Sequence, residues 1–117
     1  MMKALVISDD PAVRAGTERI FRERLGFSAV VSAGHGEALG VFLAESPTHV
    51  VLDGYDEHEG GPEHARVGAV TYRDLVAAAQ EGQRIVRCGW PAYGYPDYIQ
   101  LPFLVESLAQ ALGVPVP

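Results

Sequence analysis

The sequence predicts a doubly wound α/β domain built on a five-stranded parallel sheet. Short apolar runs, typical of strands that are covered on both faces, alternate with segments whose apolar residues recur at helical spacing. Such alternation predicts parallel strands joined by right-handed crossovers. The predicted strands are residues 3–8, 27–32, 49–53, 84–88 and 98–101.

Four helices are expected between and after these strands. The first has Asp10 as its N-cap and Pro11 in its first turn, and runs to about Arg24. Pro47 is expected to close the second, the third spans about 69–81, and the last runs from Pro102 to Gly113. The residues expected to face the core are Val13, Thr17, Ile20 and Phe21, then Leu39, Phe42 and Leu43, then Tyr72, Leu75, Val76 and Ala79, and finally Leu104, Leu108, Ala111 and Leu112.

Length and composition indicate one domain in a reducing compartment. A chain of 117 residues falls within the ~100–150 residues of a typical domain, so residues 1–113 are assigned to it and 114–117 to an extended tail or the start of a linker. A net charge of -6 argues against direct binding to nucleic acid or to anionic membranes. Because Cys88 is the only cysteine, and no leader or membrane-length apolar run is evident, we expect a cytoplasmic protein.

Three aspartates follow predicted strands and are the main candidates for chemistry. Asp9 and Asp10 follow the first strand, and Asp53 ends the third. These strand ends meet in the common doubly wound order, so the carboxylates are expected to converge. Since like charges repel, the cluster should take up protons or bind a cation, for which Mg²⁺ is the natural choice, and one carboxylate could attack a phosphodonor. Alternatively, Asp10 only caps a helix and the other acids lie at solvated strand ends.

Two segments resemble the receiver domains of response regulators in two-component signalling. Residues 5–10 (Leu-Val-Ile-Ser-Asp-Asp) are similar to the first strand and acidic pair of that family, and residues 50–54 (Val-Val-Leu-Asp-Gly) to its phosphoacceptor strand. The resemblance extends over essentially the whole chain. It implies a flavodoxin-like sheet of order 2-1-3-4-5, with Asp53 as the phosphoacceptor and Asp9, Asp10 and Asp53 as ligands of Mg²⁺.

The sequence departs from the receiver pattern at the positions that operate the switch. Cys88 stands where the family carries a Ser or Thr at the end of the fourth strand, and a thiol is the weaker hydrogen-bond donor. Leu101 stands where the family carries a Lys before Pro102, so the charge-assisted bond to a phosphoryl group is lost.

The fourth helix of the family is predicted to be missing or reduced to a loop. Two prolines and two glycines lie within residues 89–97, which excludes an ordinary helix. Four aromatic residues in and after this segment either form a partner-binding surface or fold over the sheet in place of the helix: Trp90, Tyr93, Tyr95 and Tyr98.

Four further features carry less weight. The loop after the third strand contains acids and two histidines that could bind a transition metal, although a solvated acidic loop is the simpler interpretation: Asp56, Glu57, His58, Glu59, Glu63 and His64. Residues 56–61 also match a short cobalamin-binding pattern, but after the wrong strand, and we reject that match. His35 is expected in a strand-to-helix turn, and Cys88 is expected to be a buried thiol, since no His is placed by sequence to activate it.

These observations favour an atypical receiver-like signalling module over an enzyme. It would act through a protein partner, either a sensor kinase or a downstream signalling protein, with homodimerisation as a further option. Mg²⁺ is an optional ligand, and no cofactor is expected to be essential. The alternatives are a competent phosphoacceptor in a phosphorelay and, with less support, a small ligand-binding or enzymatic domain that uses the loop after Asp53 and the segment 90–98.

Overall fold

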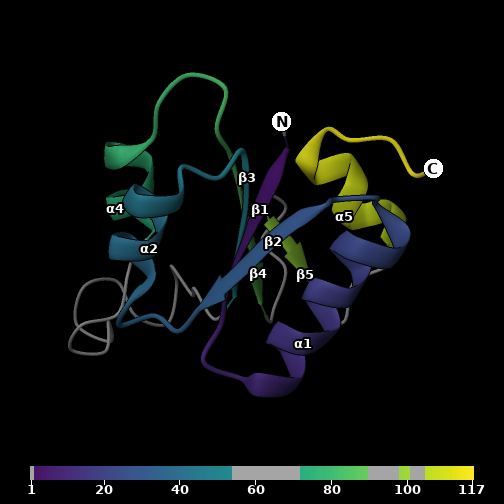
Figure 1. The fold of residues 1–117 in the computed structure, drawn as a ribbon, viewed down its shortest axis with the longest axis horizontal. Helices are drawn as coiled ribbons and strands as arrows, with labels where there is room; N and C mark the ends of the chain where they lie inside the picture. Colours follow the sequence, from purple (N-terminus) through teal and green to yellow (C-terminus); the bar gives the residue numbers. More distant parts are fainter. Residues whose placement is uncertain (1, 54–71, 90–97, 101–104) are drawn as a thin grey trace.

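The fold is a parallel β-sheet with helices on both faces (Figure 1). A computed structural model describes residues 2–53, 72–89, 98–100 and 105–117. The strands are β1 (Lys3–Ile7), β2 (Ala29–Ala33), β3 (His49–Asp53), β4 (Arg84–Gly89) and β5 (Tyr98–Gln100). All of their pairings are parallel, and the sheet order is β2-β1-β3-β4-β5. The predicted order is confirmed for the four strands of five or six residues, while β5 is a three-residue strand at the edge.

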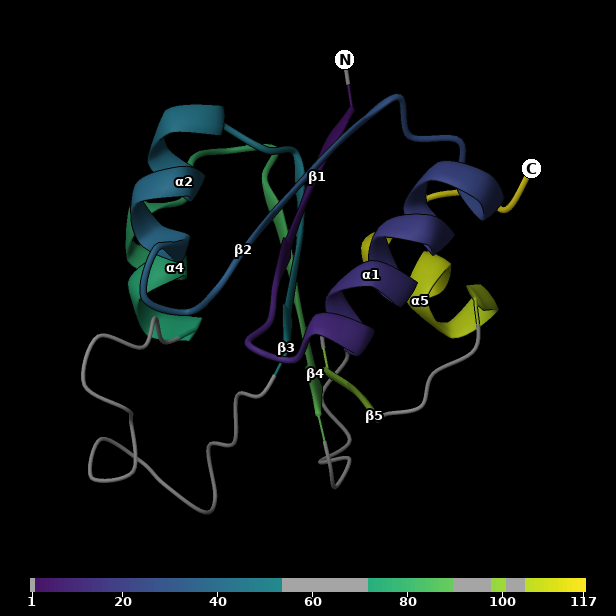
Figure 2. The same ribbon diagram turned by 60° about the horizontal axis from the view of Figure 1, so that its bottom comes forward.

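The helices form two layers that sandwich the sheet (Figure 2). One layer contains α1 (Pro11–Arg19), which continues into the π-helical turn η1 (Ile20–Arg24), and α5 (Val105–Leu112). The other layer contains α2 (Ala38–Glu45) and α4 (Tyr72–Ala78). None of the helices in the described part of the chain combines the length and apolar character needed to cross a bilayer.

Each face of the sheet has its own hydrophobic core, because successive side chains of a strand point to opposite faces. The core under α1 and α5 contains Phe21, Leu25 and Phe27 together with Leu108 and Leu112. The core under α2 and α4 is formed by the alternate residues of β1 and β3 with side chains from the two helices: Leu5, Ile7, Val50, Leu52, Ala38, Phe42 and Leu75.

Helix ends lie close to where the sequence predicts them. Asp10 caps α1, and its Oδ1 accepts hydrogen bonds from the backbone N–H of Ala12 and Val13. Gly26, with φ of 73°, allows the chain to turn after η1. At the end of α2, Ser46 takes the left-handed conformation immediately before Pro47, which disfavours continued helix.

Three of the residues predicted to face the core are instead exposed. Leu39 and Leu43 on α2 are 38% and 60% exposed, and Val76 on α4 is 48% exposed. Each directly follows a buried residue, and one residue rotates the side chain by about 100° around a helix axis. The predictions were wrong because, once Ala38, Phe42 and Leu75 occupy the core, their neighbours face away from it.

Strand β2 begins later than predicted, because Phe27 belongs to the turn. Its backbone N–H donates to the carbonyl of Phe21 at 2.9 Å, and its ring packs edge-on against Phe21 with centroids 4.9 Å apart. Phe27 is therefore buried as part of a turn that joins η1 to the sheet, and β2 starts at Ala29.

Some predictions concern residues outside the described parts of the structure. These are the loop at 56–64, the missing fourth helix and aromatic segment at 90–97, Leu104, and the switch position Leu101 with Pro102. Tyr98 and Tyr72 are described through their backbone, in β5 and α4.

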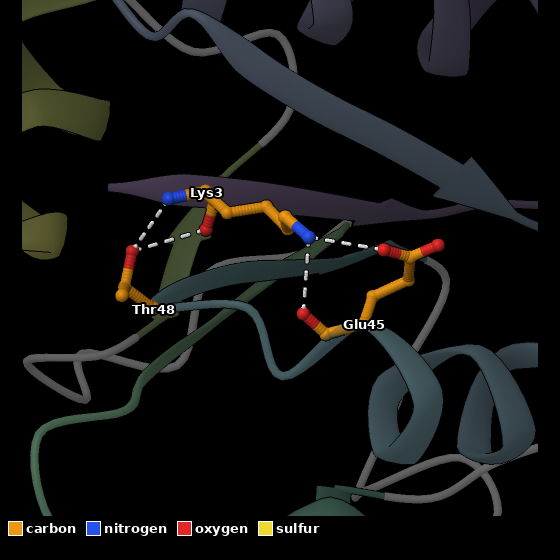
Figure 3. A network of polar contacts seen from close by, with 3 residues as sticks. All are labelled: Lys3, Glu45 and Thr48. Atoms are coloured by element: carbon orange, nitrogen blue, oxygen red, sulfur yellow. Dashed lines mark hydrogen bonds and ion pairs between the residues drawn. The ribbon is translucent and has the colours of Figure 1, made fainter. Parts of the chain in front are cut away.

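A polar network at the amino end of β1 joins this strand to the segment after α2 (Figure 3). The backbone N–H of Lys3 donates to Thr48 Oγ1 at 2.9 Å, and Oγ1 lies 3.0 Å from the carbonyl oxygen of Lys3. The Lys3 ammonium reaches Glu45 Oε2 at 3.0 Å and the Glu45 carbonyl oxygen at 3.3 Å. The network fixes the C-terminus of α2 against the edge where β1 and β3 begin.

Candidate functional site

Three polar side chains lie side by side at the carboxyl end of the sheet, at the ends of three adjacent strands. In β3, Asp53 pairs in register with Cys88 of β4, and Leu52 pairs with Ile7, so that Ser8, which follows β1, comes next to Asp53. Each of these three side chains continues a row of alternate core residues along its strand. The rows are Ala4 and Val6 of β1, followed by Ser8; Val51 and Asp53 of β3; and Val86 and Cys88 of β4. The polar group therefore ends the hydrophobic core on the side of the sheet covered by α1 and α5.

The Asp53 carboxylate is held between the other two side chains. The Ser8 hydroxyl donates to Oδ2 at 2.6 Å, a short bond of the kind that an anionic acceptor makes. The Cys88 thiol donates to Oδ1 at 3.9 Å, a long contact even for sulfur. Ser8 and Cys88 are fully buried and Asp53 is 8% exposed, so both carboxylate oxygens have partners within the protein.

Cys88 is a protonated thiol in this setting. Burial raises its pKa well above the ordinary value, and the negative charge and hydrogen bond of Asp53 raise it further. Nucleophilic chemistry requires the thiolate, so this environment opposes it.

His35 connects two of the predicted site aspartates from the loop between β2 and α2. Its backbone N–H donates to Asp9 Oδ1 at 2.9 Å, and its ring Nε2 lies 2.6 Å from the backbone carbonyl oxygen of Asp53. Since a carbonyl oxygen only accepts, Nε2 carries a proton, and the buried Nδ1 makes no hydrogen bond to the described residues. Sequence reasoning assigned His35 to this turn but missed its contact with Asp53.

Gly34 allows the close approach of this loop to Asp9. A Cβ atom at position 34 would lie 3.1 Å from Asp9 Oδ1, tighter than ordinary packing. A side chain there would displace either the loop or the carboxylate, so Gly34 maintains the contact between Asp9 and His35.

The three predicted magnesium ligands do not form a ready-made metal site. Asp53 is engaged by Ser8 and Cys88, Asp10 caps α1, and Asp9 accepts from the His35 backbone. Among the described residues, no group of three acidic, His or Cys side chains lies close enough to hold a metal ion. The binding of Mg²⁺ by these three aspartates therefore stays a prediction.

Ser8 is the second site residue that sequence reasoning missed. Besides contacting Asp53, its Oγ accepts the backbone N–H of Asp10 at 3.1 Å. The available signal was a polar residue at the end of an otherwise apolar run, immediately before the acidic pair.

Comparison with known proteins supports the fold that this geometry indicates. No family model and no curated protein matches the sequence. Among solved structures, the chain resembles the chemotaxis protein CheY4 of Vibrio cholerae, with a TM-score of 0.68 and 17% identity over 97% of both chains. It also resembles the N-terminal domain of an uncharacterised Wolinella succinogenes protein, with a TM-score of 0.66 and 20% identity over 97% of this chain and 92% of that one.

A third similar structure is a two-component transcriptional regulator, AraC, of Clostridium phytofermentans. The TM-score is 0.61 and the identity 16%, over 97% of this chain and 93% of that chain. The chain thus has a flavodoxin-like fold with a parallel sheet, and within that class it has the fold of receiver domains.

Proposed function

We propose that the chain is an atypical receiver-type signalling module, in which Asp53 is the position where a signal enters and a protein partner reads the result. The observation that carries this proposal is the location of Asp53. It lies at the carboxyl end of the central strand β3, with Asp9 and Asp10 on the loop that follows the neighbouring strand β1. In open α/β sheets, ligands and reactive groups gather at this edge.

Two features support an atypical mode of action. Cys88 offers Asp53 a thiol at 3.9 Å where a hydroxyl would be the stronger donor. Leu101 carries neither the charge nor the donor with which a Lys would bind a phosphoryl group. A phosphoryl group on Asp53 would still put about -1.5 to -2 charge in place of the carboxylate charge of about -1, but these two contacts would not transmit the change.

The second candidate function is phosphoacceptance within a phosphorelay, which the retained Asp53 favours. In that reaction, an Asp53 carboxylate oxygen forms a bond to phosphorus while the donor's bond to phosphorus breaks, and the donor leaves with that electron pair. In either case the chain acts on no substrate of its own, and its partner is a protein: a sensor kinase, a downstream signalling protein or a second copy of the chain. The net charge of -6 supports neither nucleic acid nor an anionic membrane as a direct partner.

The test is an NMR titration with magnesium and then with beryllofluoride, a phosphoryl mimic, repeated on Asp53→Asn. We expect shifts near Asp9, Asp10 and Asp53 that the variant lacks. Shifts that spread to the amides of β4 and β5 would favour the phosphorelay function with a complete switch. If neither addition produces a response, the receiver-type use of Asp53 is wrong, and a ligand-binding role on the same fold becomes the better explanation.

A further inference from the structure

The Ser8 hydroxyl lies between the Asp53 carboxylate and the start of α1. It contacts Asp53 Oδ2 at 2.6 Å, the backbone nitrogen of Asp10 at 3.1 Å and the carbonyl oxygen of Asp10 at 3.4 Å. Ser8 is fully buried, so these protein groups take the place of water around the hydroxyl.

The direction of these hydrogen bonds follows from the chemistry of a hydroxyl. Ser8 has one proton, and the carboxylate oxygen at 2.6 Å is a much better acceptor than the carbonyl oxygen at 3.4 Å. The hydroxyl therefore donates to Asp53 and accepts from the Asp10 N–H. The result is a continuous chain from the Asp10 backbone through Ser8 to Asp53, and each bond in such a chain polarises the next.

Asp10 passes this connection on to α1. Its Oδ1 caps the N–H groups of Ala12 and Val13, and its carbonyl oxygen accepts the first helical bond from Arg14 at 3.0 Å. A displacement of the Asp10 backbone therefore alters the whole first turn of the helix.

The other neighbour of Asp53 is poorly suited to the same task. The Cys88 thiol is a weak donor, and its contact with Asp53 is 1.3 Å longer than that of Ser8, from 3.9 Å against 2.6 Å. The strong hydroxyl contact to Asp53 thus comes from the β1 side of β3 and not from the β4 side.

We propose that Ser8 is a positioning residue that couples the chemical state of Asp53 to the first turn of α1. When Asp53 loses its charge or its Oδ2 acceptor, the Ser8 hydroxyl loses its strong partner and turns toward Asp10, which shifts the capped turn. The inference rests on the proposed role of Asp53 as the signal entry point. It places the responding surface at the N-terminus of α1, on the opposite side of β3 from β4 and β5.

The test is a double-mutant cycle that requires no phosphodonor, so it can fail or succeed independently of the proposed function. Amide chemical shifts are measured in the wild type, Ser8→Ala, Asp53→Asn and the double variant. We expect Asp53→Asn to move the amides of Asp10, Ala12 and Val13. In the Ser8→Ala background, Asp53→Asn should shift the amides of Asp10, Ala12 and Val13 no more than it shifts the amides of α5.

Two matched controls separate coupling from general loosening. In the Cys88→Ala and Thr48→Val backgrounds, Asp53→Asn should still move the α1 amides as in the wild type. The proposal is overturned if Asp53→Asn shifts the α1 amides equally with and without Ser8, or if it shifts them in no background. It is also overturned if Cys88→Ala reduces this shift as much as Ser8→Ala does. Should Ser8→Ala be too unstable to assign, Ser8→Cys serves in the same cycle, with the coupling expected to fall because a thiol is a weak donor.

Discussion

Two polar networks lie at opposite ends of the central strands, and their charged groups have different kinds of partner. At the amino end, Lys3 and Glu45 pair as opposite charges, partly exposed, with Thr48 between backbone groups. At the carboxyl end, a buried carboxylate is held by the hydroxyl of Ser8 and the thiol of Cys88. The first arrangement joins elements at little cost, whereas the second keeps an anion from water and suits a site that responds when the charge of Asp53 changes.

Removal of the Ser8 hydroxyl should have the largest effect on stability. Ser8→Ala leaves both Asp53 Oδ2 and the Asp10 N–H without this partner, so we expect the free energy of unfolding to fall by about 1–3 kcal/mol. Urea denaturation at neutral pH measures it. A loss below about 0.5 kcal/mol, the range of an ordinary surface substitution, would show that the network contributes little.

A matched change at the amino end should cost less. Thr48→Val keeps the side-chain shape but removes the oxygen that accepts the Lys3 N–H, and we expect a loss of about 1 kcal/mol. Thr48 is only partly buried, so water can replace part of the contact. If this variant lost as much stability as Ser8→Ala in the same denaturation experiment, the two networks would contribute equally and the expected difference between the two ends would be wrong.

At alkaline pH the carboxyl end should limit stability. Burial and Asp53 raise the pKa of Cys88 in the folded state. Above the ordinary thiol pKa of about 8.5, the thiol therefore loses its proton in the unfolded state first, and the free energy of unfolding falls as pH rises. Ultraviolet absorbance of the thiolate measures the titration. Asp53→Asn should lower the pKa of Cys88, although burial keeps it above the ordinary value. An unchanged titration would contradict the contact with Asp53.

At acid pH the amino end should limit stability. His49 begins β3, and burial lowers its pKa, with the nearby positive charge of Arg84 as a second cause. The unfolded state therefore binds the proton first, and the contribution of His49 is lost as pH falls below about 6.5. Arg84→Gln should raise the pKa of His49 in an NMR titration. A lower value in this variant would exclude the charge of Arg84 as a cause.

The smallest effect is expected at the ion pair. The Lys3 and Glu45 side chains are 31% and 40% exposed, so screening limits their attraction, and Glu45→Gln should cost about 0.5 kcal/mol or less. The difference should shrink further when salt is added, since the pair is accessible to ions. A salt-independent loss of more than 1 kcal/mol would mean that the pair is part of the core.

Sequence patterns predicted the sheet well because they depend on local chemistry. The apolar runs predicted the bounds of β1, β3 and β4 closely. The cap at Asp10 was also predictable, because its side chain binds a backbone N–H only two residues away. The helix faces were harder to predict. Leu43 is as apolar as Phe42, and only the position of α2 against the sheet decides which of them is buried.

The candidate site was predicted by its acids but not by its hydrogen bonds. The position of Asp53 at a strand end was clear, whereas the contacts of Ser8 and His35 with it span 45 and 18 residues of sequence. Such contacts depend on strand register and loop path. The sequence also did not predict that Asp10 and Asp9 would accept hydrogen bonds from the backbone N–H groups of α1 and of His35.

The π-helical turn η1 has a consequence for how the chain can vary in length. A π turn holds one residue more than an α-helical turn, and here the Leu25 N–H reaches back to the Ile20 carbonyl oxygen. Deleting one residue from this segment would bring the same N–H and carbonyl to the α-helical spacing of four residues, so Leu25 and Phe27 would keep their places against Phe21. Homologous sequences should therefore tolerate the loss of one residue here, and the spacing between the acidic pair and the second strand should differ among them by one residue.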